Sequence, residues 1–173
     1  MAEIRKLGRT TDHRLAMLKN QVTQVIWHGQ IKTTEQKAKE VKSLVDSLIA
    51  MAIPEKDNYE MVDKKLTRTK RDKDGQIVRE EVVSKNGKKY KRAVKEEYTA
   101  QVMKDNASRL NVRRKLIANL NKVKEDGKNV DLPGKVLSEL AEKYADRKGG
   151  YTRIIKLGKR RGDGAEEVIL QLV

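Results

Sequence analysis

Cysteine and phenylalanine are absent from this 173-residue chain, which contains only two histidines and two prolines. Without cysteine the protein forms no disulfide, iron–sulfur cluster or thiolate zinc site. His13 and His28 lie far apart in the chain, and no HExxH spacing accompanies them. The Gly-Lys pairs lack the additional glycine and the Ser/Thr of a phosphate-binding loop. We therefore expect a protein that is not an enzyme and that has no cofactor, no metal and no small-molecule substrate.

Long apolar runs are missing as well. The longest stretch without a charged residue, 20–31, includes Asn, Gln and His, whereas a membrane helix needs roughly 20 apolar residues. The first residues contain no apolar signal-peptide core. We expect a cytoplasmic protein without a membrane partner.

Positive charge is what the chain has in excess. Its 40 Lys and Arg outnumber its 25 Asp and Glu, giving a formal net charge of +15, and such an excess favours a polyanionic partner. Leu, Ile and Val supply 33 of the 118 residues in 1–53 and 109–173, but 8 of the 55 in 54–108. Because a core needs these residues, we predict one discontinuous domain, 1–53 and 109–173, interrupted by an insertion at 54–108.

The terminal segments contain clear helix and strand patterns. A basic arm at 1–11 precedes a helix at 13–28, which Gly29 is placed to end. A short strand at 30–33 leads into a second helix that stops at Pro54. A helical pattern resumes at Arg109, and another begins at Pro133. Two strand-like runs, 151–157 and 167–173, are joined by the basic loop 158–165.

The insertion carries two hairpin-turn signals, Asp74-Gly75 and Asn86-Gly87. They predict a three-stranded β-meander at about 65–94, followed by a helix at about 96–108. A ribbon with so few apolar side chains is marginally stable in water unless it has a partner surface. We therefore expect the insertion to reach additional RNA or a neighbouring protein.

The strongest basic cluster lies in 148–162, which has six basic residues, four glycines and no acid. Lys and Arg along a glycine-flanked hairpin can approach a phosphate backbone closely and bind it without reading sequence. Tyr151 can either stack on an unpaired base or be buried as a core aromatic residue. The candidate RNA-binding residues here are Lys148, Tyr151, Arg153, Lys156, Lys159, Arg160 and Arg161.

A second basic cluster combines the arm with the start of the first helix. Free N–H groups and the helix dipole favour phosphate at a helix N-terminus, although Asp12, the expected N-cap, opposes this locally. The candidate residues are Arg5, Lys6, Arg9, His13, Arg14 and Lys19.

Several motifs together resemble a known family. They are RKLGR at 5–9, HRLAMLKN at 13–20, IKTTEQKAKE at 31–40 and GGYTRIIKLGKRRGDGA at 149–165. In this order they are similar to the bacterial large-subunit ribosomal proteins of family seventeen, over residues 4–53 and about 109–173. The common form of that family is shorter and lacks most of 54–105. Lys159 and Glu166 also stand where the family has an aromatic residue and a proline.

The resemblance implies an α/β fold of the α+β type, with two layers in which helices pack on a small three-stranded mixed sheet. It implies a structural constituent of the large ribosomal subunit that binds ribosomal RNA and adjoins other ribosomal proteins near the nascent-chain exit. The family's RNA contacts map onto the two basic clusters and add Lys32. The residues alone leave open a free DNA- or RNA-binding protein, either nucleoid or regulatory.

Overall fold

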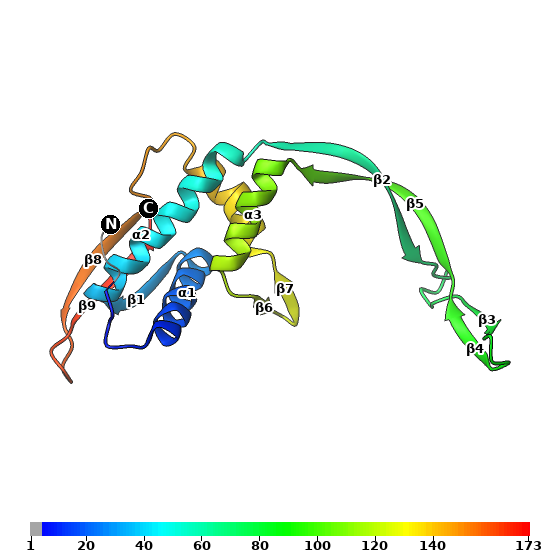
Figure 1. Cartoon of the computed structure of the whole chain (residues 1–173), viewed down its shortest axis with the longest axis horizontal. Coiled ribbons are helices and arrows are strands. Elements are labelled where there is room, and N and C mark those ends of the chain that lie inside the picture. Colours follow the sequence, from blue (N-terminus) through cyan, green and yellow to red (C-terminus); the bar gives the residue numbers. More distant parts are fainter. Residues whose placement is uncertain (1–4) are drawn as a thin grey trace. The chain divides into compact units, whose positions relative to one another are not determined.

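The computed structural model describes residues 5–173 and divides the chain into two compact units. Unit 1 comprises Met1–Asn58 and Asp105–Val173, and unit 2 is the intervening Tyr59–Lys104. Figure 1 shows helices and a small sheet in unit 1, and strands alone in unit 2. No helix in the described part of the chain is long and apolar enough to cross a membrane.

The first half of unit 1 follows its helical pattern. Helix α1 (Thr11–His28) buries Leu18, Val22, Val25 and Ile26 along one face, because side chains three or four positions apart share a face of a helix. It ends at Gly29, whose φ of 81° is the left-handed conformation expected there. Strand β1 (Gln30–Thr34) leads into α2 (Glu35–Ala52), and a short 3-10 turn at Ile53–Glu55 follows.

The sheet of unit 1 contains β1, β8 (Thr152–Lys159) and β9 (Glu166–Leu172) in the order β1-β9-β8. An α+β fold is therefore confirmed, but the expected mixed sheet is wrong, because both strand pairs are antiparallel. A hairpin joins β8 to β9, so these two strands must run in opposite directions. Val168 and Leu170 of β9 have no exposed surface and join the core formed with α1 and α2.

The remainder of unit 1 packs on the same core. Helix α3 (Ala107–Asn119) is followed by the hairpin β6 (Val123–Glu125) and β7 (Lys128–Val130). Asp126 and Gly127, with φ of 50° and 75°, form its turn. Then come α4 (Leu132–Lys135), a π-helical turn at Val136–Leu140 and α5 (Ala141–Lys143). Asp131 caps α4 by accepting a hydrogen bond from the N–H of Gly134 at 3.1 Å.

Unit 2 differs from the expected meander. Strand β2 (Tyr59–Thr69) pairs with β5 (Lys95–Asp105) to form a ribbon, and β3 (Arg79–Val83) pairs separately with β4 (Lys89–Ala93). The Asn86-Gly87 turn closes the β3–β4 hairpin, whereas a single bridge between Arg71 and Ile77 spans the Asp74-Gly75 turn. The three-stranded meander is therefore wrong, because the outer strands pair with each other.

The helix predicted at about 96–108 is also wrong. Residues 95–105 form β5, and the helix begins only at Ala107. Tyr98, Thr99 and Val102 favour a strand, and pairing with β2 satisfies the backbone groups that a helix would otherwise satisfy internally.

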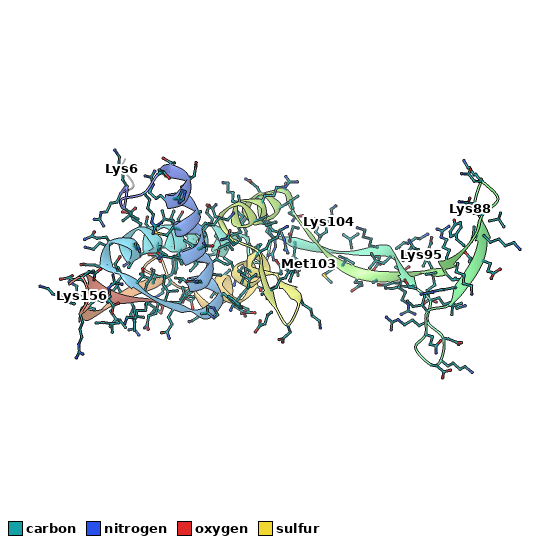
Figure 2. All side chains as sticks on the ribbon, turned by 90° about the horizontal axis from the view of Figure 1, so that it is seen from below. Lys6, Lys88, Lys95, Met103, Lys104 and Lys156 are labelled. Carbon is teal, nitrogen blue, oxygen red and sulfur yellow. The ribbon has the colours of Figure 1, made fainter. Side chains whose placement is uncertain are left out.

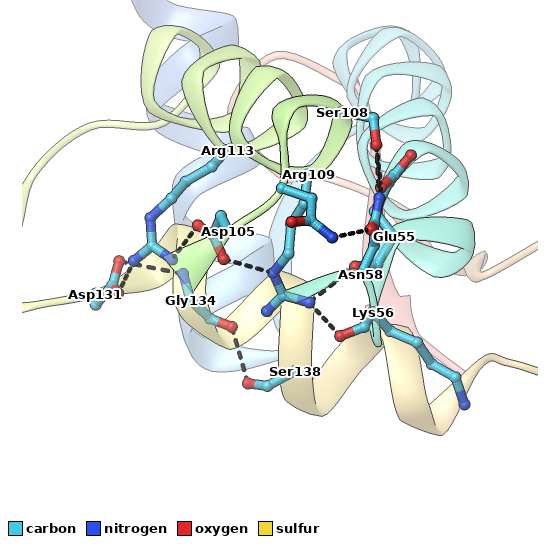
Figure 3. A network of polar contacts seen from close by, with 11 residues as sticks. Glu55, Lys56, Asn58, Asp105, Ser108, Arg109, Arg113, Asp131, Gly134 and Ser138 are labelled. Atoms are coloured by element: carbon cyan, nitrogen blue, oxygen red, sulfur yellow. Dashed lines mark hydrogen bonds and ion pairs between the residues drawn. The ribbon is translucent and has the colours of Figure 1, made fainter. Parts of the chain in front are cut away.

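A polar network holds the two ends of unit 1 where the insertion leaves and returns (Figure 3). The guanidinium of Arg109, 3% exposed, donates to Asp105 Oδ1 at 2.8 Å and to the backbone carbonyls of Glu55, at 2.8 Å, and Lys56. The side chain of Asn106 donates to Asn58 Oδ1 at 2.8 Å. Arg109 thereby joins the chain before the insertion to the chain after it.

Glu55 strengthens this junction from the side of the 3-10 turn. Its carboxylate accepts from Asn58 Nδ2 at 2.6 Å and from Ser108 Oγ at 2.8 Å. These two hydrogen bonds, that of Asn58 first, lower the pKa of the Glu55 carboxyl below its ordinary value. The ionised form is therefore the one that the network favours.

Replacing Arg109 with Ala is expected to lower the free energy of unfolding by about 3–5 kcal/mol. It leaves the carbonyls of Glu55 and Lys56 without this donor, and Asp105 with only the longer contact to Arg113 at 3.5 Å. Urea denaturation followed by circular dichroism measures the change. Arg114→Ala, on the exposed side of the same helix, is the matched control and should cost under about 1 kcal/mol. Equal losses in the two variants would contradict a structural role for the Arg109 network.

Candidate nucleic-acid interface

The described part of the N-terminal arm is a turn anchored on the core. Leu7 and Gly8 have φ of 54° and 65°, and the N–H of Arg9 donates to the carbonyl of Lys6 at 3.1 Å. Leu7 packs on the core, while Lys6 and Arg9 on either side are exposed. The first four residues of the predicted arm lie outside the described residues.

The basic residues of α1 do not share one environment. His13 is exposed at the start of the helix, whereas Arg14 is half-buried. Within the described residues, the Nε of Arg14 is buried without a hydrogen-bond partner. Lys19 is half-buried beside Leu120 and Asn121, and lines a pocket of about 500 Å³ with them. The structure therefore separates Lys19 from the exposed cations at the start of the chain.

Tyr151 is a core residue. Its side chain is 4% exposed, its ring lies 5.3 Å from that of Tyr144, and its hydroxyl donates to the carbonyl of Arg147 at 3.2 Å. The interpretation of Tyr151 as a base-stacking residue is thus wrong, because its ring packs inside the protein and gains more from burial there.

The exposed face of the C-terminal hairpin begins at Arg153. With the amide of Gln171 oriented so that its oxygen faces Arg153, that oxygen accepts two hydrogen bonds of 2.7 Å from the guanidinium. Ile155 and Leu157 follow on alternate positions of β8 and are 40% and 50% exposed. A register shift between Lys156 and Gly158 then interrupts the pairing with β9.

The loop after β8 is organised by one carboxylate. Arg160 donates to both oxygens of Asp163, from Nε at 2.9 Å and from Nη2 at 2.5 Å, and the N–H of Ala165 donates to the same side chain at 3.2 Å. These bonds, that of Arg160 first, hold the pKa of the Asp163 carboxyl far below its ordinary range. Lys159 and Arg161, on either side of Arg160, are exposed.

Carboxylates distant in the sequence pair with several predicted RNA-binding cations. Lys32 lies 2.7 Å from Glu167, Lys156 lies 3.8 Å from Glu35, and Arg5 lies 3.8 Å from Glu40. The sequence held no signal for these pairs, because each depends on the packing of separate elements. Among the described residues, no ion pair involves Lys6, Arg9, Lys148, Lys159 or Arg161.

Helix α2 brings the two basic clusters to one end of unit 1. Its first turns provide Glu35, which pairs with Lys156, and Glu40, which pairs with Arg5. Figure 2 shows Lys6 and Lys156 at that end. Lys148 precedes β8, whereas Lys159 ends it, and eight residues at roughly 3.3 Å each place about 26 Å between the two ends of the strand. Lys148 is therefore separated from the loop cations.

A third basic segment was not among the predicted sites. Residues 82–95 of unit 2 contain six basic residues and no acid. The signal was available in the sequence, since this run is as free of acids as 148–162. It was obscured by the many acids elsewhere in the insertion.

These features describe a basic α+β protein whose exposed cations lie on turns and hairpins, as in proteins that bind polyanions as structural components. A family profile for Ribosomal protein L17 matches residues 17–173, and the chain belongs to that family. It is 50% identical to the large ribosomal subunit protein bL17 of Ruminiclostridium cellulolyticum over 171 residues, with 98% of each chain covered. Its identity to the bL17 proteins of Acetivibrio thermocellus and Lachnospira eligens is 46% and 45%, with 98% and 100% of each chain covered.

Family membership makes the chain a structural, non-enzymatic constituent of the large ribosomal subunit, and places it with the ribosome in the cytoplasm. The expected family and its non-enzymatic role are confirmed by these comparisons.

The Asp163 carboxylate is expected to stay ionised from pH 6 to pH 3. Its folded-state pKa is lowered, so the Arg160 pair stabilises the loop above the unfolded-state pKa, and this contribution is lost only as pH falls through the lowered folded-state value. Carboxyl ¹³C shifts measured by NMR report the charge directly. In Arg160→Gln the same carboxyl should titrate nearer about 3.9. Titration of Asp163 near that value in the unaltered chain would contradict the pairing.

Proposed function

We propose that the chain binds large-subunit ribosomal RNA through its N-terminal turn and its C-terminal hairpin, and stabilises the RNA between them. The observation that carries this proposal is a group of exposed cations at these two places that form no ion pair with any other described residue, chiefly Lys6, Arg9, Lys159 and Arg161. Cations that are free of carboxylates can neutralise phosphates without first breaking an internal pair.

The paired cations have a second role in this proposal. Arg160 is held by Asp163, and Lys32 by Glu167, so these side chains order the hairpin that presents Lys159 and Arg161. RNA contact then begins with the unpaired cations. The contact surface extends to predicted cations that are close in sequence to these: Arg5, His13, Arg14, Arg153 and Lys156. Lys19 and Lys148 lie at the edge of the proposed surface.

The binding that we propose is to the backbone and shape of RNA, with no base-specific readout. Phosphate contacts fix the orientation of a protein but carry no sequence information. A protein that uses such contacts serves to hold RNA helices relative to one another. Neighbouring large-subunit proteins are its other expected partners.

The protein should sediment with the large subunit in a sucrose gradient at moderate salt, since many phosphate contacts act together at that ionic strength. Immunodetection of gradient fractions measures its position. High salt, which weakens phosphate contacts, serves as the control and should shift the protein toward the top. A protein that stays at the top at moderate salt would instead support the free nucleic-acid-binding alternative.

A triple variant with Ala in place of Lys156, Lys159 and Arg161 should bind RNA more weakly. The slope of log affinity against log salt should fall by about 2, because each lost phosphate contact lowers that slope by roughly 0.7–0.9. The variant keeps Arg160 and Asp163, so the loop remains ordered. Filter binding with ribosomal RNA at several salt concentrations measures the slope.

The matched control replaces Lys122, Lys124 and Lys128 with Ala. All three are exposed, and they lie in the β6–β7 hairpin or directly before it. It changes the net charge equally. Equal slopes for the two triple variants would show that overall charge, and not the C-terminal hairpin, determines affinity.

A further inference from the structure

The β3–β4 hairpin of unit 2 concentrates positive charge that the proposed RNA surface of unit 1 does not use. Residues 70–94, which include the hairpin, carry nine basic and four acidic residues. The two strands of the ribbon, β2 and β5, instead carry five of each. The ribbon is therefore electrically balanced when Asp105 is counted with it, and five of the six excess positive charges of unit 2 lie in 70–94.

Strand register places this charge at one end of the hairpin. Its two acids, Glu80 and Glu81, lie opposite Arg92 and Lys91 at the open end. At the turn end, Val82 lies opposite Tyr90, and Val83 opposite Lys89. The acids can therefore compensate cations only near the open end, and the turn end remains positive.

The turn itself is held by backbone hydrogen bonds that leave the lysine side chains unengaged. The N–H of Ser84 donates to the carbonyl of Lys88 at 2.8 Å, and that of Gly87 to the carbonyl of Ser84 at 2.9 Å. The hydroxyl of Ser84 accepts from the N–H of Asn86 at 3.1 Å. Gly87 has a φ of 74°, which the closed turn requires. Lys85 and Lys88 are thus presented from a defined turn.

These lysines have no internal partner. Within residues 5–173, the ion pair of unit 2 is Arg68 with Glu96, at 2.5 Å in the ribbon, and none involves Lys85, Lys88 or Lys89. All three are exposed, and Figure 2 shows Lys88 at the turn end. Lys159 and Arg161 of unit 1 are likewise exposed cations on a hairpin, but there a carboxylate, that of Asp163, pairs with the neighbouring Arg160.

The side chains of the hairpin favour a polyanion over a protein partner. Its exposed apolar residues, Val83 and Tyr90, are 59% and 48% exposed. They lie on opposite faces, because Tyr90 is paired with Val82 and side chains alternate between faces along a strand. Neither face is a continuous apolar surface of the kind that fits a protein. Cations, in contrast, occur on both faces and on the turn.

We propose that the turn end of the β3–β4 hairpin is a second RNA-binding site, in which Lys85, Lys88 and Lys89 bind phosphates of the large-subunit RNA. The inference rests on the proposed function in taking ribosomal RNA as the polyanion. The ribbon acts as a spacer: each of its eleven-residue strands spans about 36 Å at roughly 3.3 Å per residue. The binding site therefore lies at the far end of the ribbon from Tyr59.

The test compares two triple variants of the full chain. Lys85→Ala, Lys88→Ala and Lys89→Ala remove the proposed contacts, while Lys64→Ala, Lys65→Ala and Lys104→Ala remove equal charge from exposed positions in the ribbon. The hairpin variant should lower the slope of log affinity for ribosomal RNA against log salt by about 2, and the affinity at 0.1 M salt by roughly 10- to 100-fold. The ribbon variant should change affinity by less than about threefold.

The outcomes separate this inference from the function on which it rests. If the unaltered chain fails to bind ribosomal RNA, the proposed function is wrong and this inference falls with it. If the unaltered chain binds and the two triple variants have the same slope, the hairpin site alone is wrong.

Photocrosslinking in the assembled subunit identifies the partner directly. Asn86→benzoylphenylalanine places a photoreactive group on the exposed turn, at a position that is not in the left-handed conformation. Irradiation should yield a crosslink to RNA that nuclease digestion removes. A crosslink to protein instead, resistant to nuclease, would assign the hairpin to a neighbouring ribosomal protein and overturn the proposal.

Discussion

When a segment is inserted into a domain, contacts must hold together the points where the chain leaves the domain and returns to it. In this protein a buried guanidinium makes these contacts. Arg109 binds the carbonyls at the end of the first half and the carboxylate of Asp105 at the start of the second. Asn58 and Asn106 pair across the same junction. Since these groups belong to unit 1 alone, its core can form independently of what unit 2 contacts.

The proposed RNA-binding surface also depends on ion pairs within unit 1. Carboxylates on α2 and β9 engage Arg5, Lys32 and Lys156, and Asp163 engages Arg160. In the free protein these pairs fix the geometry of the turn and hairpin and limit mutual repulsion among the cations. Among the described residues, the cations outside these pairs, such as Lys159 and Arg161, are exposed, so contact with a phosphate requires little rearrangement.

Much of unit 1 could be predicted because its signals are local. The apolar spacing of α1 and the Gly29 end signal depend on neighbours within one or two turns. The pairing direction of β1 with β9 depends on residues more than a hundred positions apart, so the mixed sheet was an error of topology. Tyr151 was ambiguous for a related reason: whether an aromatic residue is buried depends on Tyr144 and the C-terminal strand, which composition does not place.

Unit 2 was harder to predict, because the β3–β4 pair lies within the segment that separates β2 from its partner β5. The segment 95–105 contains acids, lysines and an alanine that suit a helix beside Tyr98, Thr99 and Val102, which suit a strand, and pairing with β2 decides between the two. The environment of the candidate RNA-binding cations also depends on residues that are distant in the sequence. Charge runs are visible in the sequence, but their partners Glu35, Glu40 and Glu167 are not, since folding alone brings them within reach.

The ribbon of unit 2 has a geometric consequence for variation in length. Side chains alternate between its faces, so removal of one residue from each strand would turn the β3–β4 hairpin to the opposite side, whereas removal of two from each would restore its orientation. Because the ribbon carries as many acids as bases, such shortening need not alter the charge presented beyond it. Insertions of this kind can therefore be tuned in steps of four residues, with the hairpin moved by about 7 Å at each step.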